Sequence, residues 1–196
     1  MLEALIKGGW MMVPLAVCSL ISVTIIIERI FLFYRMERPH RAEEVITLIR
    51  ARRTEEAMEI ADKDTSPVMR VLKTGMTHIL EPSGAMESAG VSELSLMRRG
   101  LPALDTIITL SPLLGLLGTI IGMINSFHVM ACSGLGQPVA VTGGVAEALV
   151  CTATGITVAV ITLIPYNYFL ARIEREAEAI ETYATRFEIA LAGSKG

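Results

Sequence analysis

The chain has 196 residues, of which 52% are hydrophobic and 19% are charged, and its mean hydropathy is +0.55. A soluble domain carries about 25% charged residues, so these values exclude an ordinary soluble globular protein and make a membrane protein the expected class. The formal net charge is -3, and the middle of the chain mixes acidic and basic residues, which argues against a nucleic-acid partner.

Three uncharged runs approach or exceed the roughly 20 apolar residues with which a helix crosses a bilayer. The first covers residues 10–27, between Lys7 and Glu28. The second, residues 106–146, contains no Lys, Arg, Asp or Glu, and the third covers residues 148–171. We therefore expect an all-α membrane protein with three transmembrane helices surrounded by membrane lipid.

The second run is too long for one span, because at about 1.5 Å per residue it would reach roughly twice the thickness of the hydrocarbon layer. Within it, "ACSGLGQPVAVTGG" (residues 131–144) is rich in glycine, proline and serine, which are typical of loops. The sequence thus predicts a second span at residues 107–130, a short outer loop at 131–144, and a third span at 144–171.

The distribution of Lys and Arg predicts the orientation of the chain. The segment from residue 28 to 105 holds twelve of the seventeen basic residues, the tail after Ala171 holds four, and the loop at 131–144 holds none. Because basic residues are retained in the cytoplasm, the N-terminus is expected outside. The first span continues into "ERIFLFYR" without a cleavage site, so it is expected to be an anchor.

Four regions follow from these assignments. They are an N-terminal anchor span (1–30), a cytoplasmic helical loop (31–105), two spans with their outer loop (106–171), and a cytoplasmic helical tail (172–196). In the cytoplasmic loop, apolar residues recur at helical spacing, and Ser66 before Pro67 is typical of a helix start. "EPSG" at residues 81–84 interrupts the pattern. We expect the charged helices to extend the spans into the cytoplasm.

Neither a metal site nor an enzyme active site is expected. The cysteines (Cys18, Cys132 and Cys151) are widely spaced, and the three histidines are scattered, so no metal-ligand or disulfide spacing is present. The chain also lacks a recognisable set of nucleophile, base and oxyanion groups. No cofactor is therefore expected.

Small residues recur in the second and third spans. Gly115, Gly118 and Gly122 lie in the second span, the last two in a GxxxG arrangement, and Gly155 lies in the third. Small residues allow the backbones of membrane helices to approach closely, so helix packing is the simplest explanation.

Three polar residues of the spans suggest more than packing. Glu147 is expected at the outer end of the third span, where it is either a functional ionisable group or a hydrated interfacial one. A single threonine means little, because its hydroxyl can bond to its own helix. Thr119 and Thr152, however, are expected at similar depth on antiparallel helices, which suits a narrow wetted passage or a polar partner helix.

The same residues resemble a known family. "PLLGLLGTIIGMINSF" followed by "GGVAEALVCTATGITVAVITLIPYNYF" is similar to the paired motifs of the ExbB/TolQ/MotA proton-channel family, and the order of anchor, loop and two spans also matches its three-span members. The resemblance covers nearly the whole chain and is stronger to ExbB than to TolQ or to the four-span MotA. Matched residue by residue, Thr119, Glu147 and Thr152 occupy the family's polar pore positions.

The resemblance implies a homopentamer in the bacterial inner membrane, whose second and third spans line a pore. The pore would hold the helices of a dimeric, single-span ExbD-like partner, and proton flow would drive motion that a TonB-like protein carries to outer-membrane transporters. The glycine face of the second span would then lie toward neighbouring subunits and the partner helix. The titrating carboxylate would belong to the partner, because no Asp or Glu lies mid-span in this chain.

Other functions remain open at this point. A TolQ-like subunit would use a Tol-type partner in place of TonB. A non-conducting membrane scaffold would explain the glycines but not the threonine pair. A small-molecule transporter would be expected to show an inverted repeat, and none is evident in the three spans.

Overall fold

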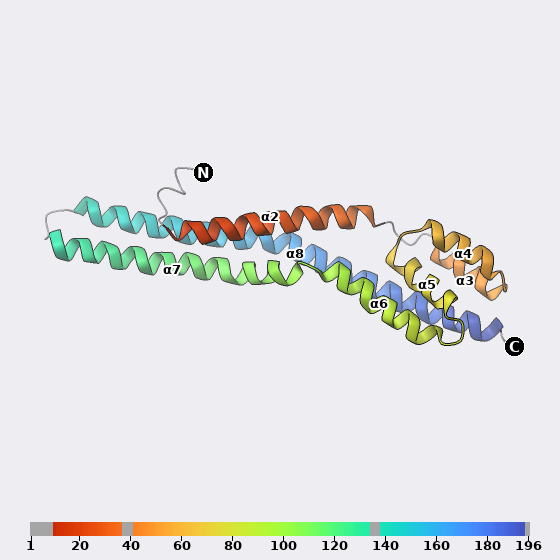
Figure 1. The fold of residues 1–196 in the computed structure, drawn as a ribbon. Coiled ribbons are helices and arrows are strands. Elements are labelled where there is room, and N and C mark those ends of the chain that lie inside the picture. Colours follow the sequence, from red (N-terminus) through yellow and green to blue (C-terminus); the bar gives the residue numbers. More distant parts are fainter. Residues whose placement is uncertain (1–9, 37–40, 134–137, 195–196) are drawn as a thin grey trace. The chain divides into compact units, whose positions relative to one another are not determined.

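The computed structural model describes residues 10–36, 41–133 and 138–194, which form helices joined by turns (Figure 1). No strand occurs in these ranges. The helices are α2 (Met12–Arg35), α3 (Ala42–Arg50), α4 (Thr54–Lys63), α5 (Pro67–Thr77), α6 (Pro82–Arg98), α7 (Leu101–Ser133) and α8 (Pro138–Ser194).

The chain divides into two compact units. The first, called the span unit below, comprises Met1–Glu28 and Gly100–Asn167. The second, called the loop unit, comprises Arg29–Arg99 and Tyr168–Gly196. Helices α2 and α8 each contribute residues to both units.

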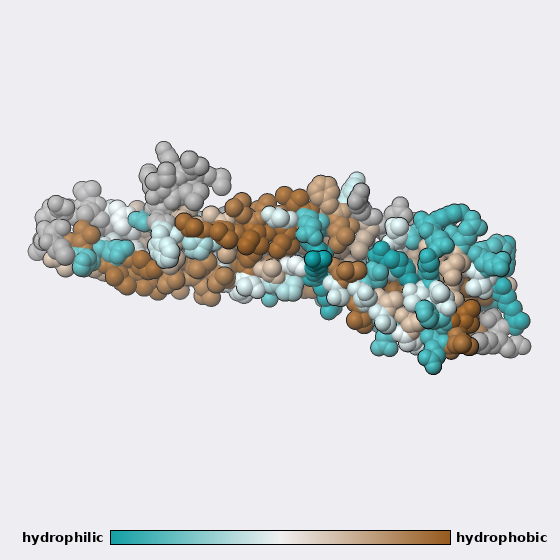
Figure 2. Space-filling view, in the orientation of Figure 1, coloured by the Kyte–Doolittle hydropathy of each residue, from teal (hydrophilic) through white to brown (hydrophobic). Residues whose placement is uncertain are grey.

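Three helical stretches are long and apolar enough to cross a membrane: Met12–Tyr34, Pro82–Ala131 and Thr142–Gly193, with mean hydropathies of 2.2, 2.1 and 2.0. At most a third of their most apolar windows is buried inside the chain, so most of this apolar surface needs lipid or protein around it. Hydrophobic surface extends over α2 and α7, whereas α3 and α4 carry hydrophilic surface (Figure 2). The prediction of an all-α protein with three helices of spanning length is confirmed.

The loop between the second and third predicted spans is shorter than the sequence predicts. Helix α7 continues to Ser133 and α8 already begins at Pro138, so only residues 134–137, which lie outside the described residues, separate the two helices. The prediction of a loop over residues 131–144 is therefore wrong at both ends. Proline is tolerated in the first turn of a helix, where its missing N–H needs no partner, and this allows Pro138 to begin α8.

Helix α7 also begins earlier than the predicted second span. Gly100, with a φ of 83°, ends the turn that separates α6 from α7, and α7 starts at Leu101. A positive φ is costly for residues with a side chain, so glycine suits this position. Pro112 lies inside α7 without ending it.

The loop unit has a hydrophobic core of its own. Side chains from α3, α4, α5, α6 and α8 form it, and the large, fully buried ones include Val45, Met69, Leu72, Met86 and Phe187. The sequence predicted the helical spacing of the apolar residues in α3 and α4. The structure shows that these residues pack into a shared core and do not merely cover solvated helices.

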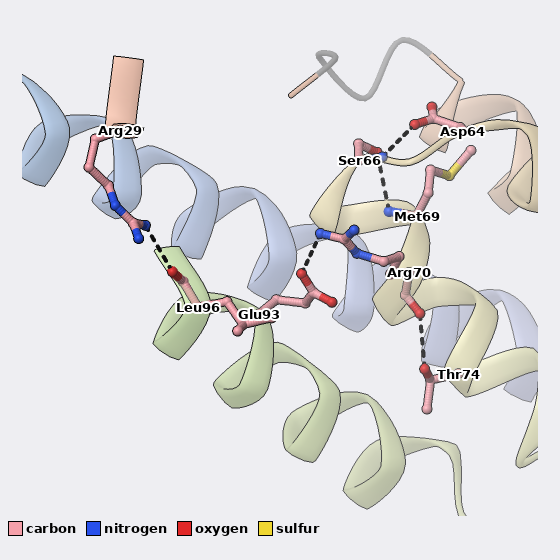
Figure 3. A network of polar contacts seen from close by, with 8 residues as sticks. All are labelled: Arg29, Asp64, Ser66, Met69, Arg70, Thr74, Glu93 and Leu96. Carbon is pink, nitrogen blue, oxygen red and sulfur yellow. Dashed lines mark hydrogen bonds and ion pairs between the residues drawn. The ribbon is translucent and has the colours of Figure 1, made fainter. Parts of the chain in front are cut away.

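Polar contacts fix the start of α5 and its position against α6 (Figure 3). The Ser66 hydroxyl accepts a hydrogen bond from the backbone N–H of Met69 at 3.4 Å, which confirms the predicted helix start. The Asp64 carboxylate accepts one from the Ser66 N–H at 2.8 Å. From the first turn of α5, Arg70 reaches Glu93 on α6 at 2.5 Å.

Candidate functional site

Helices α7 and α8 lie closely side by side in the span unit (Figure 1). A Cβ atom on Gly115 would meet the Thr152 Cα at 3.0 Å, and one on Gly122 would meet the Ala148 Cβ at 2.9 Å. A Cβ on Gly155 would run into the carbonyl oxygen of Ser111. The two backbones can therefore touch only because these positions have no side chain.

The fourth predicted packing glycine, Gly118, faces the Cys151 side chain of α8. The sequence suggested that this glycine face lies toward neighbouring subunits and a partner helix. In the structure, α8 of the same chain contacts the α7 glycines. Any leucine-sized side chain at Gly118 would first disturb the pairing of α7 with α8 within one chain.

A hydrogen bond between side chain and backbone joins the two helices at the same level. The Thr152 hydroxyl on α8 donates to the carbonyl oxygen of Gly115 on α7 at 2.9 Å. The absence of a side chain at Gly115 leaves that carbonyl within reach of the other helix. Thr119, one turn further along α7, instead donates within its own helix, to the Leu116 carbonyl oxygen at 2.6 Å.

Glu147 lines a small cavity of about 130 Å³ in the span unit. The other lining residues come from the turn just before α2, from α7 and from α8: Trp10, Met11, Gly118, Ile121, Gly122, Asn125 and Gly144. Two of the predicted packing glycines thus border the predicted carboxylate. Asn125 adds an amide that can donate and accept hydrogen bonds.

The predicted site residues therefore fall into two local groups. Thr152 is joined to Gly115, and Glu147 shares a cavity with Gly118 and Gly122. The hydroxyls of Thr119 and Thr152 form no hydrogen bond with each other among the described residues; each donates to a different backbone carbonyl.

Buried hydroxyl groups in the spans were not identified from the sequence. Ser111 is fully buried opposite Gly155, and its hydroxyl has no hydrogen-bond partner among the described residues. Thr162 is also fully buried, but its hydroxyl donates to the Val158 carbonyl of its own helix. Serine and threonine are common in membrane helices, so their sequence positions alone did not identify these two residues.

Two buried charged residues of the loop unit were also missed as site candidates. The Arg29 side chain on α2 donates to the carbonyl oxygens of Leu96 and Met97 at 3.1 and 3.3 Å, close to the C-terminus of α6 (Figure 3). A guanidinium is favoured there, because the helix dipole places negative potential at that end. The sequence analysis counted Arg29 only as a basic residue near a span end.

The second, Glu176, is 4% exposed on α8. One carboxylate oxygen lies 3.5 Å from the Arg172 guanidinium, and the other has no hydrogen-bond partner among the described residues. Burial raises the pKa of Glu176 above its ordinary value of 4.5, and the nearby Arg172 charge lowers it by less. Its spacing from the buried Ile173 and Ile180 places it on the core face of α8, a signal that was available in the sequence.

The arrangement in the span unit brings together groups that can hydrogen-bond to water or to a polar partner helix. These groups are the Thr119 and Thr152 hydroxyls and the Glu147 carboxylate. The Thr152–Gly115 bond also holds α7 and α8 at a fixed distance. An ionisable residue such as Glu147 within an apolar span is a functional candidate by default.

Comparison with known proteins shows that the chain is similar to members of one family. Residues 63–182 match the model of the MotA/TolQ/ExbB proton channel family. An ExbB-like biopolymer transport protein of Synechocystis, ExbB-like 3, is 35% identical over 195 residues, which cover 93% of this chain and 90% of that protein. An ExbB homologue of Methanothermobacter thermautotrophicus is 36% identical over 64% of this chain and 46% of its own length. The Tol-Pal system protein TolQ of Pseudomonas aeruginosa is 37% identical over 55% of this chain and 46% of its own length.

Proposed function

We propose a function for this chain from one premise: it belongs to the MotA/TolQ/ExbB proton channel family. The proposed function is that of a proton-channel subunit in an energy-transducing motor of the bacterial inner membrane. In this proposal the chain forms a homopentamer with its N-terminus outside, and α7 and α8 line the pore. A dimer of a single-span, ExbD-like protein occupies the pore, and a TonB-like protein carries the resulting motion to the outer membrane.

The observation that carries this proposal is the polar composition of the paired helices α7 and α8. Between residues 106 and 171, Glu147 is the only Asp or Glu, whereas Thr119 and Thr152 provide hydroxyls on the two helices. Proton transfer needs a group that titrates, so the main relay carboxylate is assigned to the partner helix. The threonines are assigned to the wall that this carboxylate contacts, and Glu147 to one end of the pathway.

The similarity to ExbB-named proteins favours an ExbB-like role. The ExbB-like protein of Synechocystis matches 93% of the chain, whereas the TolQ of Pseudomonas aeruginosa matches 55%. A TolQ-like subunit of a Tol-Pal system is the second candidate, because that shorter match has a similar identity of 37%. Restoration of siderophore-type uptake in a strain lacking ExbB, without restoration of Tol-dependent outer-membrane integrity in a strain lacking TolQ, would distinguish the two.

The test of conduction replaces each threonine by valine, which has nearly the same shape but no hydroxyl. Thr119→Val and Thr152→Val are expected to insert and to assemble with the single-span partner, while energy-dependent uptake and proton flux fall at least tenfold at matched expression. The physical reason is that a buried polar group left without a partner costs about 1–3 kcal/mol, enough to shift the relay between its protonation states.

Thr24→Val is the matched control. Its hydroxyl donates to the Leu20 carbonyl of its own helix at 2.8 Å, as the Thr119 hydroxyl does to Leu116, but it lies on α2, outside the proposed pore wall. This variant is expected to stay active. Normal proton flux in both pore variants would remove the support for the proposed pathway and favour a non-conducting scaffold.

Glu147→Gln separates two roles for the carboxylate. If Glu147 is a hydrated group at the pore mouth, Glu147→Gln is expected to lower proton flux less than the threonine variants do. If Glu147 takes up protons directly, the loss of flux is expected to be at least as severe.

A further inference from the structure

A groove of about 390 Å³ lies between α6 and α8 in the loop unit, and none of the residues of the proposed proton pathway lines it. Each helix contributes a stripe of residues at spacings of four, three and four, which places them on one helical face. The α6 stripe is Ser83, Glu87, Gly90 and Leu94, and the α8 stripe is Ala177, Glu181, Ala184 and Glu188.

The floor of the groove is apolar and preformed. Met86 and Ile180 are 1% and 7% exposed and belong to the core of the loop unit. A Cβ on Gly90 would meet the Ile180 Cγ2 at 3.2 Å, so α6 and α8 approach closely at the base of the groove. The small side chains of Ala177 and Ala184 leave the space above this floor open.

The rim of the groove carries negative charge that no described basic residue neutralises. Glu87 lies on one side, and Glu181 and Glu188 lie on the other. Among the described residues, none of these three carboxylates forms an ion pair. Other glutamates of the loop unit do pair: Glu93 with Arg70 at 2.5 Å and Glu43 with Arg186 at 2.6 Å.

We propose that this groove binds a basic amphipathic helix of a partner protein. The apolar floor suits the anchors that such a helix presents at positions i, i+3 or i+4, and i+7, and the two carboxylate-bearing sides suit flanking Lys or Arg side chains. Charge complementarity of this kind speeds association and selects the partner. The exposed Val91, which is 64% accessible and also lines the groove, extends the apolar surface toward the rim.

The carboxylates also argue against an anionic lipid surface as the occupant, because an anionic surface attracts basic segments and repels glutamates. A second copy of this chain is a different occupant, which the experiment below distinguishes.

The experiment uses the full-length protein in nanodiscs of zwitterionic lipid and a fluorescent 18-residue peptide of leucine and lysine, with leucines at helical spacing. Fluorescence anisotropy measures its affinity against empty nanodiscs. The triple variant Glu87→Gln, Glu181→Gln and Glu188→Gln is expected to weaken binding at least tenfold. The matched triple Glu55→Gln, Glu174→Gln and Glu178→Gln makes the same change of charge at exposed sites outside the groove and is expected to change the affinity less than twofold.

Two peptide controls test the mode of binding. A scrambled peptide of the same composition and a leucine–glutamate peptide are both expected to bind at least tenfold more weakly than the amphipathic basic peptide. Equal binding of the scrambled peptide, or equal weakening by the two triple variants, would overturn the proposal. If the triple variant of the groove glutamates forms a smaller oligomer than the wild type in the absence of peptide, the groove is assigned to a second copy of the chain. That result would also overturn the proposal.

Discussion

The Thr152 hydroxyl donates a 2.9 Å hydrogen bond to the Gly115 carbonyl oxygen, at a level where the two helix backbones approach closely. The bond therefore joins α8 to α7 directly, without an intervening side chain of α7. Thr152 thus has a structural role and also a position in the proposed proton pathway. Different measurements test the two roles.

Thr152→Ser is expected to keep both roles, because serine retains the hydroxyl, whereas Thr152→Val loses the bond between the helices. The expected loss of stability in Thr152→Val is about 0.6 kcal/mol, the average for hydrogen bonds between membrane helices. Thermal unfolding in detergent measures this. Thr154→Val is the control, because the Thr154 hydroxyl donates only to the Val150 carbonyl of its own helix. An equal loss in both valine variants would contradict a specific role for the Thr152–Gly115 bond.

Gly155→Ala is expected to destabilise the span unit by roughly 1–3 kcal/mol, because its methyl group would collide with the Ser111 carbonyl and force α7 and α8 apart. Gly143→Ala makes the same change on α8 where a new Cβ would meet nothing within 4 Å beyond the adjoining backbone of its own helix, so it is expected to leave stability unchanged or to raise it. The midpoint of thermal unfolding and resistance to proteolysis in detergent report the difference. Similar midpoints for the two variants would show that α7 and α8 can separate at little cost.

Glu176 makes stability depend on pH in a defined direction. Because burial raises its pKa in the folded state above 4.5, the folded state binds more protons than the unfolded state between 4.5 and that raised pKa. The free energy of unfolding therefore falls as the pH rises through this window, and the loss persists above it. Glu176→Gln is expected to unfold at a higher temperature than the wild type at neutral pH, with a gap that narrows toward pH 4.5.

Glu174→Gln is the control for this pH series, because Glu174 is exposed on the same helix. It is expected to follow the wild-type profile. A Glu176→Gln protein that is less stable than the wild type at neutral pH would show that the attraction of Arg172 outweighs the cost of burial.

Cysteine labelling tests the proposed orientation. Cys18 and Cys151 are buried, so a Cys132→Ser background should react little with a membrane-impermeant maleimide. In that background, Ser133→Cys at the end of α7 is expected to react from outside the cell, and Ser83→Cys at the start of α6 is expected to react only after the membrane is opened. The reverse pattern would invert the topology and the assignment of the loop unit to the cytoplasm.

The sequence predicted the features that depend on local composition. Long apolar runs predicted the three helices of spanning length, and Ser66 before Pro67 predicted the start of α5. The outer loop was predicted too long, because proline and glycine favour loops in water but are accepted near the ends of membrane helices. The partners of Thr152 and Thr119 could not be predicted, because they depend on how α7 and α8 are rotated about their axes. Glu176 could have been found from its position on the core face of α8.

The direction of the threonine hydrogen bonds has a consequence for what the proposed pore wall can bind. A hydroxyl has one proton to donate, and Thr119 and Thr152 both use it on backbone carbonyls. What each oxygen still offers is a lone pair, so the two side chains act as acceptors toward any visiting group. A protonated carboxylic acid, a water molecule or a hydronium ion can donate to them, whereas an ionised carboxylate cannot do so and must first displace one of the two helix bonds. The proposed pore wall therefore binds groups that carry a proton in preference to ionised carboxylates.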